Sequence, residues 1–362
     1  MTEARNAAMR GAIRAMSARL DVAAARRDAD IRHYRIAGAW VSVYATRGWP
    51  AERLLAACEP LRTPACDAPP ELELHIWNDA VDSLALPDND VLRRQNALPD
   101  GLGGFSDGAS NAFFQPDAGV LSILDLPARR AHWWLRDAST VPYYERAAPF
   151  KHILQWWMAA RGGALLHSAA IGCADVGDRR GVLISGPSGS GKSSTALACL
   201  GAGMGFCSDD YVLVDADHPP IAHLAYATAK VQRQSLGRFD GYNAYFRNLA
   251  DVDEKPMMFV HEFAPQSVRE SIRPIALVMP RVAHAAQTHF VPISAATMMR
   301  AVAPSSVLLF PLAGARSFKR IAQLCSSLPC FRAELADDPH DVARAFAGLF
   351  AQPAVARTPA VA

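Results

Sequence analysis

The chain has 362 residues, of which 51% are hydrophobic and 20% charged, and its formal net charge is +2. This composition is typical of a folded globular protein with room for one large domain or two ordinary ones, and it excludes an intrinsically disordered chain. A net charge so close to zero gives no support to a nucleic-acid partner.

The cysteines and the apolar runs indicate a compartment. Seven cysteines are scattered along the chain, with no Cys-x-x-Cys pair and no Cys/His set at zinc spacing. We expect reduced, mostly packed thiols, as in a reducing compartment. No apolar run reaches the roughly 18 residues that a membrane span needs, and the N-terminal region lacks the apolar core of a secretion signal. The sequence therefore predicts a cytoplasmic protein with no membrane span.

The first part of the chain divides into a short segment and a β-rich region. Residues 1–32 are rich in Arg and Ala and predict a helical or flexible N-terminal segment. Residues 33–145 predict a β-rich domain that could recognise the acceptor, because short apolar runs alternate there with Pro, Gly, Asp and Asn. Strands are expected at Tyr34–Ala45, Glu71–Trp77, Gly119–Leu124 and Ala131–Leu135, a helix at Pro50–Leu61 and a loop at Asp100–Ser110.

The second part reads as an α/β layer structure with a mixed or parallel sheet, over residues 146–352, followed by a flexible tail at 353–362. A helix at 149–161 carries Trp156 and Trp157, which we expect to pack between the two halves. Strands are expected at Ala164–Gly172, Gly181–Ser185, Phe206–Val214, Met257–Phe263 and Arg273–Pro280, and helices at 294–303, 316–327 and 339–351.

A phosphate-binding motif lies between the strand at Gly181–Ser185 and the start of a helix. The segment fits G-x-x-x-x-G-K-[ST] at every fixed position. Its glycines let successive backbone N–H groups converge on phosphate oxygens, Lys192 can bridge the β- and γ-phosphates, and the Ser193 hydroxyl can ligate Mg²⁺. We therefore predict that ATP and Mg²⁺ bind here, with contacts from Gly186, Pro187, Ser188, Gly189, Ser190, Gly191, Lys192, Ser193 and Ser194.

Two acidic residues, Asp209 and Asp210, follow the motif. One carboxylate can hold Mg²⁺ and the other can take the proton from an attacking hydroxyl, and neighbouring side chains of a strand would point to opposite faces and so divide these roles. Which residue takes which role is left open. His167 lies in an apolar segment upstream of the motif, and on its own such a residue is more often part of the core.

Three segments, Leu166–Ile171, Gly186–Ser194 and Gly205–Val214, resemble the core of bacterial HPr kinase/phosphorylase-type serine kinases. The resemblance implies a P-loop kinase core with a mixed sheet, related to phosphoenolpyruvate carboxykinases, beside a smaller β-rich α+β domain. It implies that Asp209 is the acid/base, that Asp210 and Ser193 hold the metal, and that Lys192 contacts the phosphates. His167 would orient the γ-phosphate or Asp209.

Two further segments, Tyr226–Lys230 and Asp253–Lys255, resemble a branch of these kinases that includes lasso-peptide precursor kinases. On this reading Lys230 reaches a phosphate or an acceptor carboxylate, and Glu254 completes a metal or lysine contact. Arg233 and Arg238 are candidates for a cap on the transferring phosphoryl group. Surface charges on loops are an equally good interpretation of Lys230 and Glu254.

The predicted function is an ATP-dependent kinase that transfers the γ-phosphoryl group to a serine or threonine hydroxyl of a protein or peptide, including a ribosomally made peptide precursor. A kinase for a small hydroxylated metabolite and a non-catalytic ATP-binding regulatory module are the alternatives. An exposed sheet edge in the β-rich half would favour a peptide, and a closed pocket a metabolite. A homo-oligomer is left open.

Overall fold

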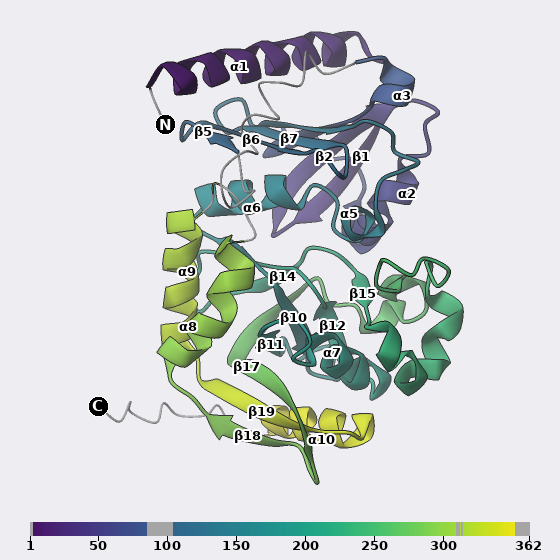
Figure 1. Ribbon diagram of the computed structural model, residues 1–362, viewed down its shortest axis with the longest axis vertical. Helices are drawn as coiled ribbons and strands as arrows, with labels where there is room; N and C mark the ends of the chain where they lie inside the picture. The colour runs from purple at the N-terminus through teal and green to yellow at the C-terminus, as the bar shows by residue number, and fades with distance from the viewer. Residues whose placement is uncertain (1–2, 85–103, 309–311, 313, 352–362) are drawn as a thin grey trace.

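The computed structural model describes residues 3–84, 104–308, 312 and 314–351. Within them the chain forms two large sheets, one from each half, with helices between and around them (Figure 1). The expected tail at 353–362 and the first part of the expected loop at Asp100–Ser110 lie outside the described residues. No helix in the described part of the chain is both long and apolar enough to cross a membrane.

The N-terminal sheet is mixed, because β2 and β8 both run parallel to β4 and the other neighbours are antiparallel. The strands predicted at Glu71–Trp77, Gly119–Leu124 and Ala131–Leu135 are present, but a turn at Ala37–Gly38 divides the run Tyr34–Ala45 between β1 and β2, and β1 already begins within the segment expected to be helical or flexible. The order is β3-β1-β2-β4-β8-β7-β6-β5, with bounds β1 Ala29–Ile36, β2 Ala39–Thr46, β3 Arg62–Thr63, β4 Leu72–Asn78, β5 Phe105–Ser106, β6 Ser110–Gln115, β7 Val120–Asp125 and β8 Arg130–Leu135.

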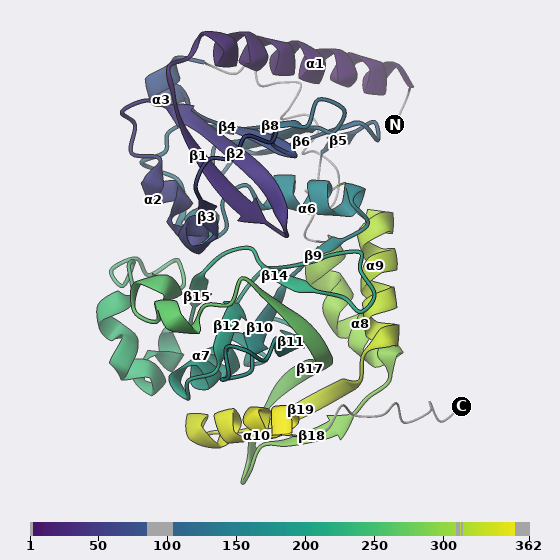
Figure 2. The same ribbon diagram turned by 180° about the vertical axis from the view of Figure 1, so that it is seen from behind.

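The long helix α1 (Glu3–Arg26) lies across one face of this sheet (Figures 1 and 2). Its Ile13, Met16 and Leu20 are buried at helical spacing and belong to one apolar cluster with Trp77 and Trp134 of the sheet. Strand residues such as Val41 and Leu74 belong to a second apolar cluster, with Leu54, Leu55 and residues of the helix at Lys151–Ala160. The buried residues of α1 thus supply a cover for apolar strand residues that would otherwise contact water.

The helix predicted at Pro50–Leu61 is wrong as a single α-helix. Only α2 (Glu52–Leu55) is α-helical, and the chain continues as a tighter 3₁₀ helix over Ala56–Leu61. Pro60 explains the change, because it lacks the N–H that an α-helix needs and its ring clashes with the carbonyl four residues earlier. Two other short helices, α3 (Asp79–Asp82) and α5 (Tyr143–Arg146), also lie in this part of the chain.

Helix α6 (Lys151–Ala160) joins the two halves. It contacts β7 of the first sheet on one side, and β9 and α9 of the second half on the other. Its Trp156 and Trp157 are buried in a single apolar core that includes strand residues of both sheets, as predicted. The two sheets therefore share one core across this helix.

The second sheet is also mixed, since β11 and β19 run parallel to the long central strand β17 while the other pairs are antiparallel. Its main order is β12-β10-β11-β17-β14-β13-β9, and β19 pairs with β17 and β18. The bounds are β9 Ala164–Leu166, β10 Ser168–Gly172, β11 Arg180–Ser185, β12 Gly205–Ser208, β13 Val212–Val214, β14 Ala222–Leu224, β17 Ser271–Ala285, β18 His289–Pro292 and β19 Cys330–Ala336.

The helices of the second half match the sequence pattern. They are α7 (Lys192–Gly201), α8 (Ala295–Ala303), α9 (Gly314–Ser327) and α10 (Pro339–Ala351). An apolar cluster joins α7 and α10 to the sheet.

A 3₁₀ segment (Arg233–Tyr245) and a two-stranded pair, β15 (Thr228–Lys230) with β16 (Met257–Phe259), lie beside α7. The predicted strand at Met257–Phe263 therefore ends at Phe259, and a 3₁₀ turn follows it.

Two predicted strands of the second half are broken in the middle. The run Ala164–Gly172 is interrupted at His167, and Phe206–Val214 is interrupted at Asp209–Tyr211. On one side of the breaks β10 pairs with β12, and on the other β9 pairs with β13, so the breaks lie opposite each other. The Ser208 hydroxyl closes the second break by donating to the Tyr211 carbonyl (2.6 Å). The two aspartates therefore lie in a bend and not on a strand, which corrects the expectation for them.

Candidate active site

The predicted phosphate loop connects the end of β11 to the start of α7, and two of its glycines have backbone angles that other residues rarely adopt. Gly189 has φ +80° and Gly191 φ +105°. A Cβ on Gly191 would also lie 2.8 Å from Leu335 Cδ1 on β19. Position 191 thus requires glycine for its conformation and for its close packing.

The loop has the features of an anion site. The first N–H groups of α7 have no acceptor within the helix, and they point toward the loop with the positive end of the helix dipole. Lys192 is buried, and its Nζ donates to the carbonyls of Gly186 (2.8 Å) and Pro187 (3.1 Å). Burial lowers the pKa of Lys192, although Asp210 and Asp209 oppose that shift. The amide groups and the lysine together fit the tail of a nucleoside triphosphate.

Asp209 is almost completely buried, at 1% exposure. Its Oδ2 accepts a hydrogen bond from the Lys230 backbone N–H (2.8 Å), and its Oδ1 makes no hydrogen bond of ordinary geometry with a described residue. Burial and the charge of Asp210 raise the pKa of Asp209 to about 6, against the Lys230 amide and the Ser193 hydroxyl, which lower it. A carboxylate with such a pKa can exchange a proton near neutral pH.

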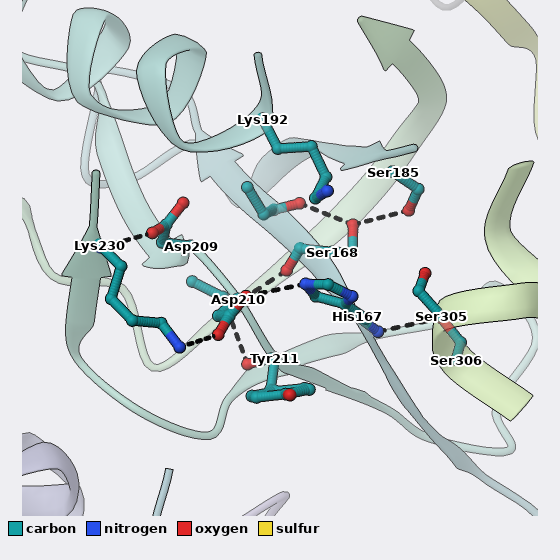
Figure 3. A network of polar contacts seen from close by, with 12 residues as sticks. His167, Ser168, Ser185, Lys192, Asp209, Asp210, Tyr211, Lys230, Ser305 and Ser306 are labelled. Carbon is teal, nitrogen blue, oxygen red and sulfur yellow. Dashed lines mark hydrogen bonds and ion pairs between the residues drawn. The ribbon is translucent and has the colours of Figure 1, made fainter. Parts of the chain in front are cut away.

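Asp210 points the other way and is held by two side chains (Figure 3). Its Oδ1 accepts from His167 Nε2 (2.8 Å), and its Oδ2 forms an ion pair with Lys230 Nζ. Burial opposes its charge, but Lys230 and His167 outweigh burial and hold the pKa of Asp210 well below its ordinary value. His167 therefore contacts Asp210, and the expectation that it would orient Asp209 is corrected.

A group of buried serines supports the bend, and the sequence reasoning missed it. Ser185 donates to the Ser168 hydroxyl (2.9 Å), which donates to the Ile184 carbonyl (3.0 Å). The Ser168 backbone N–H donates to the Asp210 carbonyl (3.0 Å). Their signal in the sequence is a small polar residue inside each apolar strand run, where an unpaired hydroxyl would be costly.

One cavity of about 450 Å³ collects most of the predicted site residues. It is lined by His167, Lys192, Ser193, Asp210 and Lys230, together with Ser188, Gly189, Gly191 and Ser194 of the loop. Gly186, Pro187, Ser190 and Asp209 are not part of the lining. The carbonyls of Gly186 and Pro187 hold Lys192, and the Ser190 N–H donates to the Pro187 carbonyl (3.3 Å).

Two of the predicted contact residues have other roles. The Arg233 guanidinium donates to the carbonyls of Leu249 (2.9 Å) and Asn248 (3.3 Å), and the Glu254 carboxylate accepts from the backbone N–H groups at the start of α5, of Tyr143 (3.0 Å) and Tyr144 (2.9 Å). Neither side chain lines the cavity. The structure therefore corrects the substrate or phosphate contact expected of both, because backbone groups outside the cavity hold the two side chains.

Another part of the cavity contains Arg238, which was a candidate for the phosphoryl cap, together with His284 and Asp337, which the sequence reasoning missed. Asp337 lies between His284 Nδ1 (2.9 Å) and the Arg238 guanidinium (3.3 Å), and all three residues line the cavity beside the apolar Leu335 and Val342. These residues come from β17, the 3₁₀ segment and the end of β19, so no local sequence pattern brings them together. Their mixed polar and apolar character suits a nucleoside.

Ser193 and Asp210 are the residues expected to hold the metal that the motif implies, and both line the cavity. No cluster of three or more His, Cys, Asp or Glu side chains suited to a metal occurs among the residues that the structure describes. Mg²⁺ does not require one, because it keeps several waters and is usually bound by one or two carboxylates plus substrate phosphates. Asp210 is anionic and lines the same cavity as the Ser193 hydroxyl.

Comparisons with known proteins give little further information. No protein-family model and no curated protein matches the sequence. Among solved structures, the chain is similar to one described as the Hpr(Ser) kinase/phosphatase from Coxiella burnetii, with 12% identity and a TM-score of 0.30 over 52% of this chain and 96% of that one. A TM-score this low does not establish a shared fold, so the chemistry of the site must carry the interpretation.

Proposed function

We propose that this protein is an ATP-dependent kinase that transfers the γ-phosphoryl group to a serine or threonine hydroxyl of a protein or peptide. The observation that carries the proposal is the meeting of the phosphate loop with two acidic side chains. Lys192 and Ser193 of the loop line one cavity with Asp210 and Lys230, and Asp209 directly precedes Asp210 in the sequence. These are the groups that phosphoryl transfer needs: donors for phosphate oxygens, a carboxylate for the metal and a second carboxylate for the proton.

In this proposal the loop amides and Lys192 hold the triphosphate, and Ser193 with Asp210 holds Mg²⁺. The metal supplies positive charge that offsets the charge of the phosphate oxygens. Asp209 accepts the proton of the acceptor hydroxyl, which suits its pKa of about 6. His167 and Lys230 fix the direction of the Asp210 carboxylate and keep it ionised.

The relationship to HPr kinase-type serine kinases belongs to the same proposal. It is supported by the quoted motifs and by their order along the chain: a histidine, the strand–loop–helix unit, then the Asp pair. Residues 33–145 are assigned to acceptor recognition and 146–352 to catalysis. The short β3 pairs with only His33 and Tyr34 of β1. In the described part of the chain no other strand pairs with this edge of β1, so an extended peptide could add to the sheet there. Seven free thiols suit the cytoplasm.

The test is incubation with labelled ATP and candidate peptides or lysate, followed by mass spectrometry of the phosphorylated residue. Asp209→Asn should abolish transfer and retain nucleotide binding, whereas Asp117→Asn, at an exposed turn, should change neither. A phosphorylated metabolite with no phosphorylated peptide would support the small-metabolite alternative. Full function in Asp209→Asn would show that the protein binds ATP without transferring it.

A further inference from the structure

Four lysine and arginine side chains line the cavity, and one of them differs from the rest. Lys192 is held by loop carbonyls, Lys230 by Asp210, and Arg238 by Asp337. The Lys255 side chain makes no ion pair or hydrogen bond with any residue that the structure describes. Lys255 is exposed to water, so among the described cations of the cavity its ammonium group is the one left available to a ligand, and a ligand with several negative charges would attract it.

The strand pairing locates Lys255 at the catalytic end of the cavity. Lys230 of β15 is opposite Met257 of β16, and the Val231 N–H donates to the Pro256 carbonyl (3.1 Å). Lys255 directly precedes this pair and therefore lies near Lys230. It is also close enough to Lys192 for its charge to contribute to lowering the pKa of that lysine. Lys255 is thus near the loop lysine and near Lys230, the partner of Asp210.

The backbone that carries Lys255 is fixed by buried hydrogen bonds. Asn248 is 3% exposed, and its side chain donates to the Lys255 carbonyl (3.1 Å) and accepts from the Met257 N–H (2.9 Å). Arg233 donates to the Glu254 carbonyl (3.3 Å), and the Glu254 carboxylate is bound to the start of α5. Arg233 and Glu254, which the sequence suggested as contact residues, therefore hold the position of the residue beside them.

We infer that Lys255 binds the terminal phosphate of the nucleotide, as a phosphate contact in addition to Lys192. This inference rests on the proposed nucleotide site. Lys192 lies inside the loop, where it can bridge the β- and γ-phosphates, whereas Lys255 approaches from the Lys230 side and would contact the γ-phosphate alone. The contribution of Lys255 should therefore depend on whether the third phosphate is present.

The test is isothermal titration calorimetry with two probes, Mg·ADP and the magnesium complex of the imido analogue of ATP. Lys255→Met should weaken binding of the triphosphate analogue by about tenfold, or about 1.4 kcal/mol, and binding of ADP by less than about twofold. Lys255→Arg should keep most of the affinity because it retains the charge. Lys319→Met, at an exposed lysine of α9, is the matched control and should leave both affinities unchanged.

The outcomes separate this inference from the proposed function. If the unaltered protein binds neither nucleotide, both are wrong. If it binds both and Lys255→Met weakens neither, or weakens both equally, the nucleotide site stands and the role of Lys255 is wrong. Lys255 is exposed, so its variants should fold. Unfolding curves for Lys255→Met and for a second variant, Lys255→Gln, check that the variants fold. Each folded variant must lose affinity for the triphosphate analogue and keep its affinity for ADP.

Discussion

The substitution Gly191→Ala tests the geometry of the phosphate loop most directly. Two costs add at this position. The φ of +105° is unfavourable for any residue with a Cβ, and the new methyl would lie 2.8 Å from Leu335 Cδ1 in a buried contact. We expect about 1 kcal/mol from the backbone angle and about 1 kcal/mol from overpacking, because Leu335 Cδ1 ends a flexible side chain that can shift, so the free energy of unfolding should fall by about 2 kcal/mol.

Chemical denaturation of matched variants separates the two costs. Gly203 has φ +81° and open space around it, so Gly203→Ala should show the angle cost alone, about 1 kcal/mol. In a double-mutant cycle, Leu335→Ala should be less costly in the Gly191→Ala background than in the unaltered protein, because it removes the clash. If Gly191→Ala is no more destabilising than Gly203→Ala and shows no coupling to Leu335, the close contact of the loop with β19 is refuted.

Three further predictions concern charged groups. Lys192→Ala should weaken nucleotide binding and abolish transfer together, and unchanged affinity in calorimetry would contradict its phosphate contact. Lys230→Met removes one partner of a partly buried ion pair and should lower the free energy of unfolding by about 1 to 2 kcal/mol, with partial recovery when Asp210→Asn is added, as measured by denaturation. Burial and nearby His132 lower the pKa of His75 to about 3, so the protein should lose stability as pH falls below about 6.5, by up to about 1.4 kcal/mol per pH unit. In His75→Gln denaturation midpoints should depend less on pH over this range, and an unchanged dependence would refute the assignment.

The local parts of the site could be predicted from the sequence because they are contiguous. The strand–loop–helix unit depends on an apolar run, three glycines and a lysine within about a dozen residues, and each has a local conformational reason. The apolar periodicity of α6 and the helices after it likewise depends on neighbours three and four residues away. These features can be predicted without knowing which strands pair with each other.

The errors have a different origin. The bend at Asp209–Tyr211 arises because β12 and β13 pair with different strands, and the sequence of one strand does not encode its partners. In the same way Arg233 and Glu254 looked like contact residues because they are charged and close to other motifs, but their hydrogen bonds go to carbonyls and amides distant in sequence. Lys255 could not be singled out from its neighbours until these bonds were known.

The shared core around α6 has a consequence for how the protein can be divided. Trp156 and Trp157 contribute to a single apolar cluster with strands on both sides, so cutting the chain near residue 145 would leave a wide apolar surface in water on each fragment. Either fragment expressed alone should aggregate, and co-expression should recover soluble material. An insertion or deletion that damages the N-terminal sheet should therefore also lower the stability of the catalytic half.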